Sequence, residues 1–241
     1  MSTHPPADAG VLADLAPTGA LRASINLGNP VLAQGTADAP SGVTVDLSRE
    51  IAARLGVPVA FVCFDAARKS FEALISGAAD IGYLAIEPAR EAEADFTAPY
   101  AVIEGVYAVP DGAAFATAEG VDREGVRVGV KLGSAYDLFL SRTLERAEIV
   151  RGADGIDVFR EQGLDVAAGI RQPLTRHAQR DGLRILEPRF MEIRQAVAFA
   201  KGHRPETLRF ARDLVEELKA NGFVADSIAR SGQDVTVAPP G

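Results

Sequence analysis

The sequence has no tryptophan and only one cysteine among its 241 residues. The lone Cys63 cannot form a disulfide within the chain, and its place in an apolar run favours a small buried hydrophobic side chain. A catalytic thiol would need a base, which the neighbouring residues do not supply. The absence of tryptophan excludes an indole platform for a flat ligand.

Histidine is also scarce, and basic residues are outnumbered by acidic ones. His4, His177 and His203 do not have the spacing of metal ligands, so neither a metal nor a cofactor is expected. The 33 acidic and 25 basic residues give a net charge of −8, without a cluster of lysine and arginine. Nucleic acid is therefore not expected as a partner, because phosphate binding needs such a cluster.

No apolar run approaches the length of a membrane span, and residues 1–10 lack the basic and apolar regions of an export signal. The chain as written is therefore expected to be soluble. It would be cytoplasmic if Met1 is the native start, and periplasmic if a signal peptide has been removed.

What the sequence does contain is an alternation of strand and helix patterns. Residues 21–27 alternate apolar and polar side chains, which predicts a half-buried strand. Residues 43–55 repeat an apolar side chain every four positions, which predicts a helix that ends at Gly56. With strands at 57–64 and 80–86 and a helix at 70–76, this order predicts a parallel sheet with right-handed crossovers.

The same alternation restarts near residue 126. Strands are expected at 126–130, 149–150, 166–168 and 183–186, with helices at 136–142, 156–162 and 173–179 between them, and helices from Pro205 and over 223–230 at the end. We therefore expect an α/β protein with two lobes joined by two crossover strands, at 102–109 and 196–200. The predicted parts are an N-terminal arm at 1–19, a first lobe at 20–106 and 200–241, and a second lobe at 107–199 inserted into the first.

Several segments occur together in a recognisable order. The predicted strand from Asp80 is followed by Arg90 and then, at 95–100, by the segment Asp-Phe-Thr-Ala-Pro-Tyr. Two further segments belong to predicted helices: Gly-Val-Thr-Val-Asp-Leu at 42–47 and Glu-Glu-Leu-Lys-Ala-Asn-Gly at 216–222. Over about residues 20–232, the chain resembles the family 3 extracellular solute-binding proteins, which have the type II periplasmic binding fold. The resemblance implies a monomer that closes by a hinge over a small carboxylate ligand, such as an amino acid. It also implies the membrane component of an ABC transporter as a partner.

The resemblance assigns the ligand's carboxylate to Arg90, whose planar guanidinium suits a bidentate pair. From composition alone, Arg90 would be a surface residue paired with Glu87 or Glu93. The second expected contact is the turn Gly133-Ser134-Ala135, where amides and the positive end of a helix favour an anion. A serine that only caps its helix is the structural alternative there.

The rest of the ligand is expected to meet side chains that follow the first-lobe strands, because open α/β folds bind ligands at that edge. These residues are Leu27, Asn29, Phe64 and Leu84, of which Phe64 is equally well explained as a core residue.

Two positions depart from the family pattern. Ala85 stands where a threonine is usual, and Ile170 stands where an aspartate holds the ligand's ammonium group. A buried ammonium group beside Ile170 would lack a partner, so either the ligand has none or another acid replaces the aspartate. Glu104 is the best substitute, with Gln172 as a neutral contact; an exposed strand carboxylate explains Glu104 equally well.

These features favour a solute receptor with no catalytic residues, and two other functions remain open. A few relatives with this fold dehydrate small cyclic acids, as cyclohexadienyl dehydratase does, and Glu104 or Lys131 would then act as the acid. A ligand sensor in the cytosol is the other possibility. Such a sensor would lack DNA contact, because the segment before Leu21 is too short for a helix-turn-helix.

Overall fold

The structure is a computed structural model that describes residues 8–241, and these residues form two compact units. Unit 1 contains the described residues up to Val102 together with Arg194–Gly241, and unit 2 is the inserted segment Ile103–Ile193. The chain passes from one unit to the other inside two long strands, β7 (Ala101–Pro110) and β11 (Leu183–Ala200). Both points of passage lie a few residues before the lobe boundaries that the sequence suggested. A strand pattern continues unchanged through such a point, so it does not reveal where the chain changes units.

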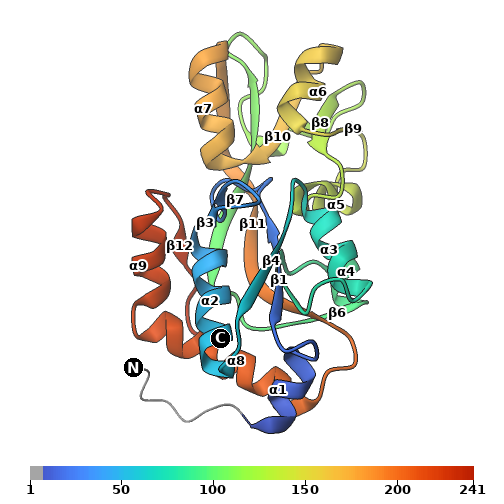
Figure 1. The fold of residues 1–241 in the computed structure, drawn as a ribbon. Helices are drawn as coiled ribbons and strands as arrows, with labels where there is room; N and C mark the ends of the chain where they lie inside the picture. The colour runs from blue at the N-terminus through green and yellow to red at the C-terminus, as the bar shows by residue number, and fades with distance from the viewer. Residues whose placement is uncertain (1–7) are drawn as a thin grey trace. The chain divides into compact units, whose positions relative to one another are not determined.

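Unit 1 is built on parallel strands, as the order of its elements predicts. Its elements are β1 (Leu21–Asn26), α2 (Val43–Leu55), β4 (Val59–Phe64), α3 (Ala67–Ile75) and β5 (Ile81–Ala85). The strand order is β4-β1-β5-β11; β1 is parallel to β4 and β5, whereas β11 is antiparallel to β5. Helices α2 and α3 lie on opposite sides of these strands (Figure 1).

Short elements and two C-terminal helices complete unit 1. These are the paired strands β2 (Gln34–Gly35) and β3 (Pro40–Ser41), α4 (Pro88–Glu91), β6 (Ala94–Phe96), α8 (Pro205–Ala220), α9 (Phe223–Arg230) and β12 (Thr236–Val237). Asp46 in the first turn of α2 accepts hydrogen bonds from Ser227 Oγ at 2.6 Å and Arg230 Nη2 at 2.9 Å. Asp46 thus has the structural role that is typical of an acid at a helix start, because it ties α2 to α9.

The prediction of a loose arm over residues 1–19 is wrong for its second half. Residues 9–15 form helix α1 (Ala9–Leu15), which the Asp8 side chain caps at Gly10 N, 2.7 Å away. Val11 and Leu15 are buried, and Asp14 accepts a 2.6 Å hydrogen bond from Thr207 Oγ1 of α8. The abundance of alanine and proline concealed a short helix that depends on packing against α8. Residues 1–7 lie outside the described part of the chain.

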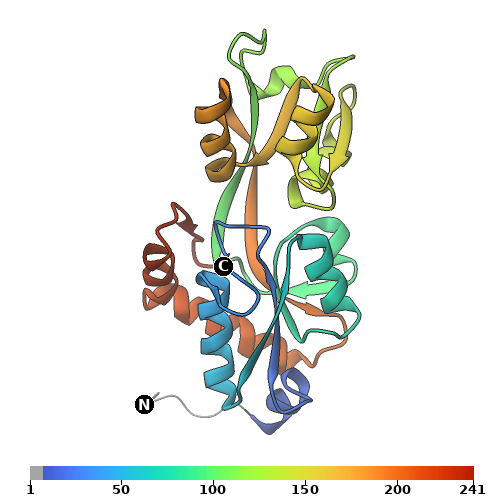
Figure 2. The same ribbon diagram turned by 45° about the horizontal axis from the view of Figure 1, so that its top comes forward.

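Unit 2 repeats the strand–helix alternation. Its elements are the start of β11, most of β7, the 3₁₀ helix η1 (Ala118–Val121), β8 (Arg127–Lys131), α5 (Ala135–Thr143), β9 (Glu148–Gly152), α6 (Gly155–Gln162), β10 (Val166–Ile170) and α7 (Arg171–Asp181). The strand order is β11-β7-β10-β8-β9; β8 is parallel to β9 and β10, whereas β7 is antiparallel to β10. Strands β7, in green, and β11, in orange, run next to each other (Figure 2).

Each unit has apolar residues packed around its sheet. In unit 2, α6 packs on β8, β9 and β10, and the buried cluster includes Val106, Ile156, Phe159 and Leu174. The predicted α/β class is therefore confirmed. No helix within residues 8–241 has the length and apolar character needed to span a membrane.

Candidate functional site

Arg90 lies in α4, the short helix that follows β5, with Pro88 in the first turn. The carboxyl ends of parallel strands are where open α/β folds bind ligands. Only 3% of Arg90 is exposed, and its Nη1 donates to the Ala85 carbonyl oxygen at 3.2 Å. The alternative of a surface arginine is therefore wrong. Ala85 contributes its backbone to the position of the guanidinium.

The charge of Arg90 persists despite its burial. Burial lowers the pKa of Arg90 to about 10, and the nearby Glu87 carboxylate opposes this effect. The guanidinium is therefore positive at neutral pH. Glu87 is also only 3% exposed, so a buried cation and a buried anion share one turn of the chain.

A pocket of about 340 Å³ lies at the ends of β1 and β4 in unit 1 and is lined by Leu27, Ala37, Cys63, Phe64, Asp65 and Lys69. It brings together two residues expected to meet the ligand, Leu27 and Phe64. Cys63 is half-buried at this pocket, because β4 is an edge strand; the expectation of a buried cysteine is therefore wrong.

Two other residues from the same set do not line this pocket. Asn29 is buried in the loop after β1, where its Oδ1 accepts a hydrogen bond from Val31 N at 3.3 Å. Leu84 is 1% exposed and packs with Leu74 and Ala198 in the core of unit 1.

In unit 2, the turn between β8 and α5 holds the predicted Gly133-Ser134-Ala135 contact. Ser134 is the N-cap of α5, and its Oγ accepts from Asp137 N at 3.1 Å. Gly133 N donates to Asp137 Oδ2 at 2.8 Å, and Ser134 N donates to the Lys131 carbonyl oxygen at 3.1 Å. The amides that can serve a ligand at this helix end are therefore those of the first two helical residues, Ala135 and Tyr136.

Asp137 is a residue that the sequence reasoning missed. It is 3% exposed, and its Oδ1 accepts from Arg151 Nε at 2.9 Å. The signal was present as Ser134-Ala-Tyr-Asp137, since an acid three residues after an N-cap serine is typical of a helix start.

Ile170, Gln172 and Glu104 lie near one another where β10 meets α7. Ile170 is the last residue of β10 and pairs with Gly105 of β7, so Glu104 is one residue from that pair. Gln172 lies in the first turn of α7. The structure thus brings together the three residues that the search for an ammonium partner singled out.

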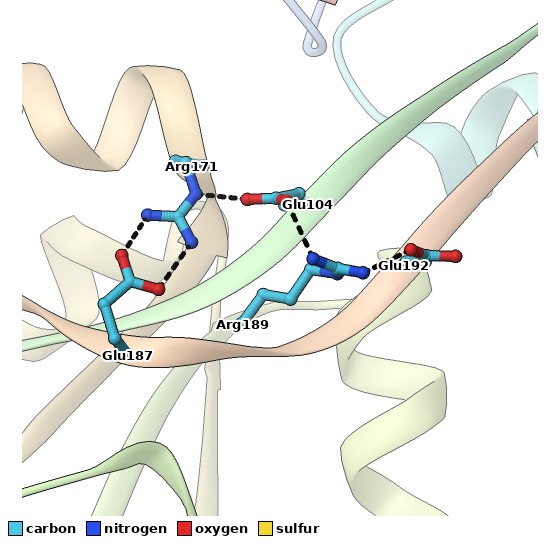
Figure 3. A network of polar contacts seen from close by, with 5 residues as sticks. All are labelled: Glu104, Arg171, Glu187, Arg189 and Glu192. Carbon is cyan, nitrogen blue, oxygen red and sulfur yellow. Dashed lines mark hydrogen bonds and ion pairs between the residues drawn. The ribbon is translucent and has the colours of Figure 1, made fainter. Parts of the chain in front are cut away.

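The Glu104 carboxylate holds arginines with both of its oxygens (Figure 3). Oε2 accepts from Arg171 Nε, and Oε1 accepts from Arg189 Nη1 at 3.2 Å. Arg171 also donates to both oxygens of Glu187, at 2.6 and 3.0 Å, and Arg189 pairs with Glu192. Hydrogen bonds from Arg171 lower the pKa of Glu187, and those to Glu187 and Glu104 raise the pKa of Arg171. An ammonium group at Glu104 would therefore have to displace a guanidinium.

The two histidines of the described residues make contacts with nearby charged side chains. His177 Nδ1 lies 3.1 Å from Arg160 Nη2, and His203 Nδ1 lies 3.2 Å from Asp14 Oδ2; His4 lies outside the described residues. In residues 8–241, no three histidine, cysteine or acidic side chains are grouped so that they could hold a metal ion.

Comparisons with known proteins agree with this architecture. Residues 25–230 match the profile of the bacterial extracellular solute-binding proteins, family 3. No curated protein sequence matches the chain.

In three of the solved structures that resemble this chain, the match covers nearly all of the solved chain. A binding component of an ABC transporter from Wolinella succinogenes, complexed with lysine, has 19% identity and a TM-score of 0.74, with 88% of this chain and 95% of that one covered. A mutant of ArgBP from T. maritima has 20% identity and a TM-score of 0.76, with 92% and 99% covered. An ancestral amino-acid-binding protein, described as a precursor of cyclohexadienyl dehydratase, has 21% identity and a TM-score of 0.74, with 91% and 98% covered. These likenesses confirm the predicted type II periplasmic-binding-protein-like fold.

Proposed function

Because this chain belongs to the bacterial extracellular solute-binding proteins of family 3, we propose that it binds a small carboxylate-bearing solute without turning it over. The solute is an amino acid or a related organic acid. The binding event serves an ABC transporter outside the cytoplasm. Similar structures described as bound to lysine, arginine or glutamine support this ligand class.

The observation that carries the proposal is the buried, positively charged guanidinium of Arg90 after β5. A guanidinium in that position pairs with a carboxylate through two parallel hydrogen bonds, which are stronger than neutral ones. The amides of Ala135 and Tyr136, at the positive end of α5, would complete the carboxylate's shell from unit 2. The ligand would then occupy a cleft between the two units and close it by a hinge.

The hydrogen bonds of the candidate catalytic acid Glu104 favour binding without catalysis. A dehydratase on this fold would need an acid free to transfer a proton, and both oxygens of the Glu104 carboxylate accept hydrogen bonds from arginines. Lys131, the other candidate, is the last residue of β8. Incubation with prephenate, followed by absorbance detection of an aromatic product, tests this point, and turnover would refute the proposal.

The central test is thermal unfolding of the wild type and of Arg90→Ala with a panel of amino acids, keto acids and hydroxy acids. A ligand at 100 times its Kd should raise the Tm of the wild type by about 5–10 °C. We expect Arg90→Ala to lose this shift, because the carboxylate would lose its charged partner. Arg209→Ala, which removes an exposed arginine of α8, is the matched control and should keep the shift. An unchanged shift in Arg90→Ala would remove Arg90 from the site.

A further inference from the structure

A second pocket of unit 1 lies beside α4, apart from the one at the ends of β1 and β4. Its volume is about 280 Å³, which is just below the range of about 300–1,000 Å³ usual for sites of small organic ligands. Helix α4 and strand β6 pack together there (Figure 1), and β6 pairs with the end of β11. The pocket is rich in charge: it is lined by the cations Arg194, Lys201 and Arg212 and by the acids Glu91 and Asp95, all of unit 1.

Two of these cations have no acid to neutralise them. Lys201 Nζ forms an ion pair with Asp95 Oδ1 at 2.7 Å. Arg212 Nε donates to the Phe96 carbonyl oxygen at 3.4 Å, and its two terminal nitrogens have no partner among residues 8–241. Within the same described residues, the Arg194 side chain has neither a hydrogen bond nor an ion pair. Both guanidinium groups are therefore available to a ligand.

The arrangement of these two arginines is what distinguishes them. Arg194 and Arg212 are exposed, and one exposed arginine is ordinary, because water hydrates its charge. Here two guanidinium groups line one pocket from separate elements, β11 and α8, so each raises the electrostatic cost of the other. The chain as a whole is acidic, with a net charge of −8, so its composition does not account for a pocket with more cations than acids. An anion between the two guanidinium groups would remove their repulsion.

A phosphate group has the charge and the shape that this pocket can satisfy. Near neutral pH a phosphate monoester carries a charge of about −1.5 to −2, which balances two guanidinium groups. Guanidinium groups bind phosphate through pairs of parallel hydrogen bonds, and one phosphate has enough oxygens to serve two of them. A single carboxylate has only two oxygens, which one guanidinium occupies.

We propose that this pocket binds a phosphate group between Arg194 and Arg212, either as the free ion or as the phosphate of a small ester. The site is separate from the carboxylate site proposed at Arg90, which does not line this pocket, and it goes beyond the function proposed above. The negative charge of Glu91 on the same pocket opposes the ligand and sets a limit on the affinity.

The test is titration calorimetry of the full chain with inorganic phosphate and with glycerol 3-phosphate. Low ionic strength is needed, because salt screens exposed charges. The wild type should bind one anion per chain with a Kd on the order of 1 mM or lower, as expected from two charge-assisted pairs of hydrogen bonds. Tighter binding of glycerol 3-phosphate would support the proposal with an ester as the ligand, and tighter binding of inorganic phosphate would support it with the free ion.

Removal of either guanidinium should weaken the binding. Arg194→Gln and Arg212→Gln are each expected to raise the Kd about tenfold or more, since each variant loses one charged pair of hydrogen bonds. Arg209→Gln is the matched control, because Arg209 is an exposed arginine of α8 that does not line the pocket, and it should bind as the wild type does. Because the substituted arginines are exposed, circular dichroism should show the wild-type fold in each variant.

Glu91→Gln tests the opposite sign. Loss of this negative charge should tighten phosphate binding about twofold or more, as expected for one exposed pair of charges. A gain in affinity cannot result from damage to the fold. Glu93→Gln is the control, since Glu93 is an exposed acid two residues further on that does not line the pocket, and its Kd should stay that of the wild type.

Three results would overturn the proposal. The first is the absence of saturable binding of both anions by the wild type. The second is an unchanged Kd in either Arg194→Gln or Arg212→Gln. The third is an equal change in the control variants Arg209→Gln and Glu93→Gln, because the anion would then respond to the net charge of the chain and not to a site.

Discussion

The Asp137 carboxylate organises the turn that is expected to face the ligand's carboxylate. One of its oxygens accepts from Gly133 N, and the other accepts from Arg151 Nε and from Ser141 Oγ at 3.2 Å. Asp137 thereby removes one amide from the set available to a ligand and fixes the entry into α5. The first two amides of the helix, those of Ala135 and Tyr136, therefore follow a turn whose shape depends on the buried Asp137 carboxylate.

We expect Asp137→Asn to lower the free energy of unfolding by about 1–3 kcal/mol, because the hydrogen bonds to this buried side chain would lose their charged acceptor. Urea unfolding followed by circular dichroism measures this difference. Asp157→Asn is the matched control, since Asp157 is 62% exposed in its side chain and pairs with Arg160 at the surface of α6. The surface pair should contribute at most about 1 kcal/mol. Equal effects of the two substitutions would argue against the role given to Asp137.

At the level of single residues, the sequence could reveal only part of the candidate site. The position of Arg90 relative to Asp95-Phe96-Thr97 was enough to identify it as a candidate ligand-binding residue, because the spacing of nearby residues can be read directly from the sequence. The burial of Glu87 could not be read in this way, since it depends on how α4 packs after β5. The partners of Glu104 were equally hidden, because Arg171 and Arg189 come from elements 67 and 85 residues away.

At the scale of elements, periodicity located most helices and strands and failed where packing decides the outcome. The helix pattern of α2 and the parallel order of β1, β4 and β5 follow from apolar spacing alone. Helix α1 has seven residues and is too short to be stable without α8. Strand β11 spans 18 residues, which the sequence analysis divided into two segments, because exposed charged residues interrupt its alternation.

The close approach of β7 and β11 depends on a glycine that the strand pattern does not explain. A Cβ at Gly105 would lie 2.6 Å from Met191 Cγ and 3.0 Å from the Phe190 ring. The Phe190 ring also packs against Tyr107, with ring centroids 4.3 Å apart. A glycine inside a strand is typical of such close packing.

Gly105→Ala should therefore reduce the free energy of unfolding by about 1–3 kcal/mol, through overpacking at β11. Gly112→Ala provides the control, because a Cβ at Gly112 meets no atom within 4 Å. Chemical denaturation of the two variants beside the wild type gives the comparison. If Gly105→Ala were as stable as Gly112→Ala, the contact with Met191 would have to relax at little cost.

At the scale of the whole chain, unit 2 is a single inserted segment, and its two connections to unit 1 are the strands β7 and β11. Any movement of one unit relative to the other must therefore be absorbed by backbone dihedral angles in or beside these two strands. Arg90, which is proposed to hold the ligand's carboxylate, belongs to unit 1, and the start of α5 belongs to unit 2. A ligand that contacts residues of both units binds most tightly to the arrangement in which both sets reach it.

The resulting prediction concerns the dimensions of the chain in solution. Small-angle X-ray scattering should show a smaller radius of gyration when the wild type is saturated with an amino acid that binds it, because binding to both units favours a closed form. Arg90→Ala at the same amino acid concentration should keep the radius of the free protein, and Arg209→Ala should contract as the wild type does. A radius that stays constant while calorimetry shows saturation would mean that the ligand is held by one unit alone. In that case the amides of Ala135 and Tyr136 would have no part in binding, and residues of unit 1, Arg90 among them, would have to account for the whole affinity.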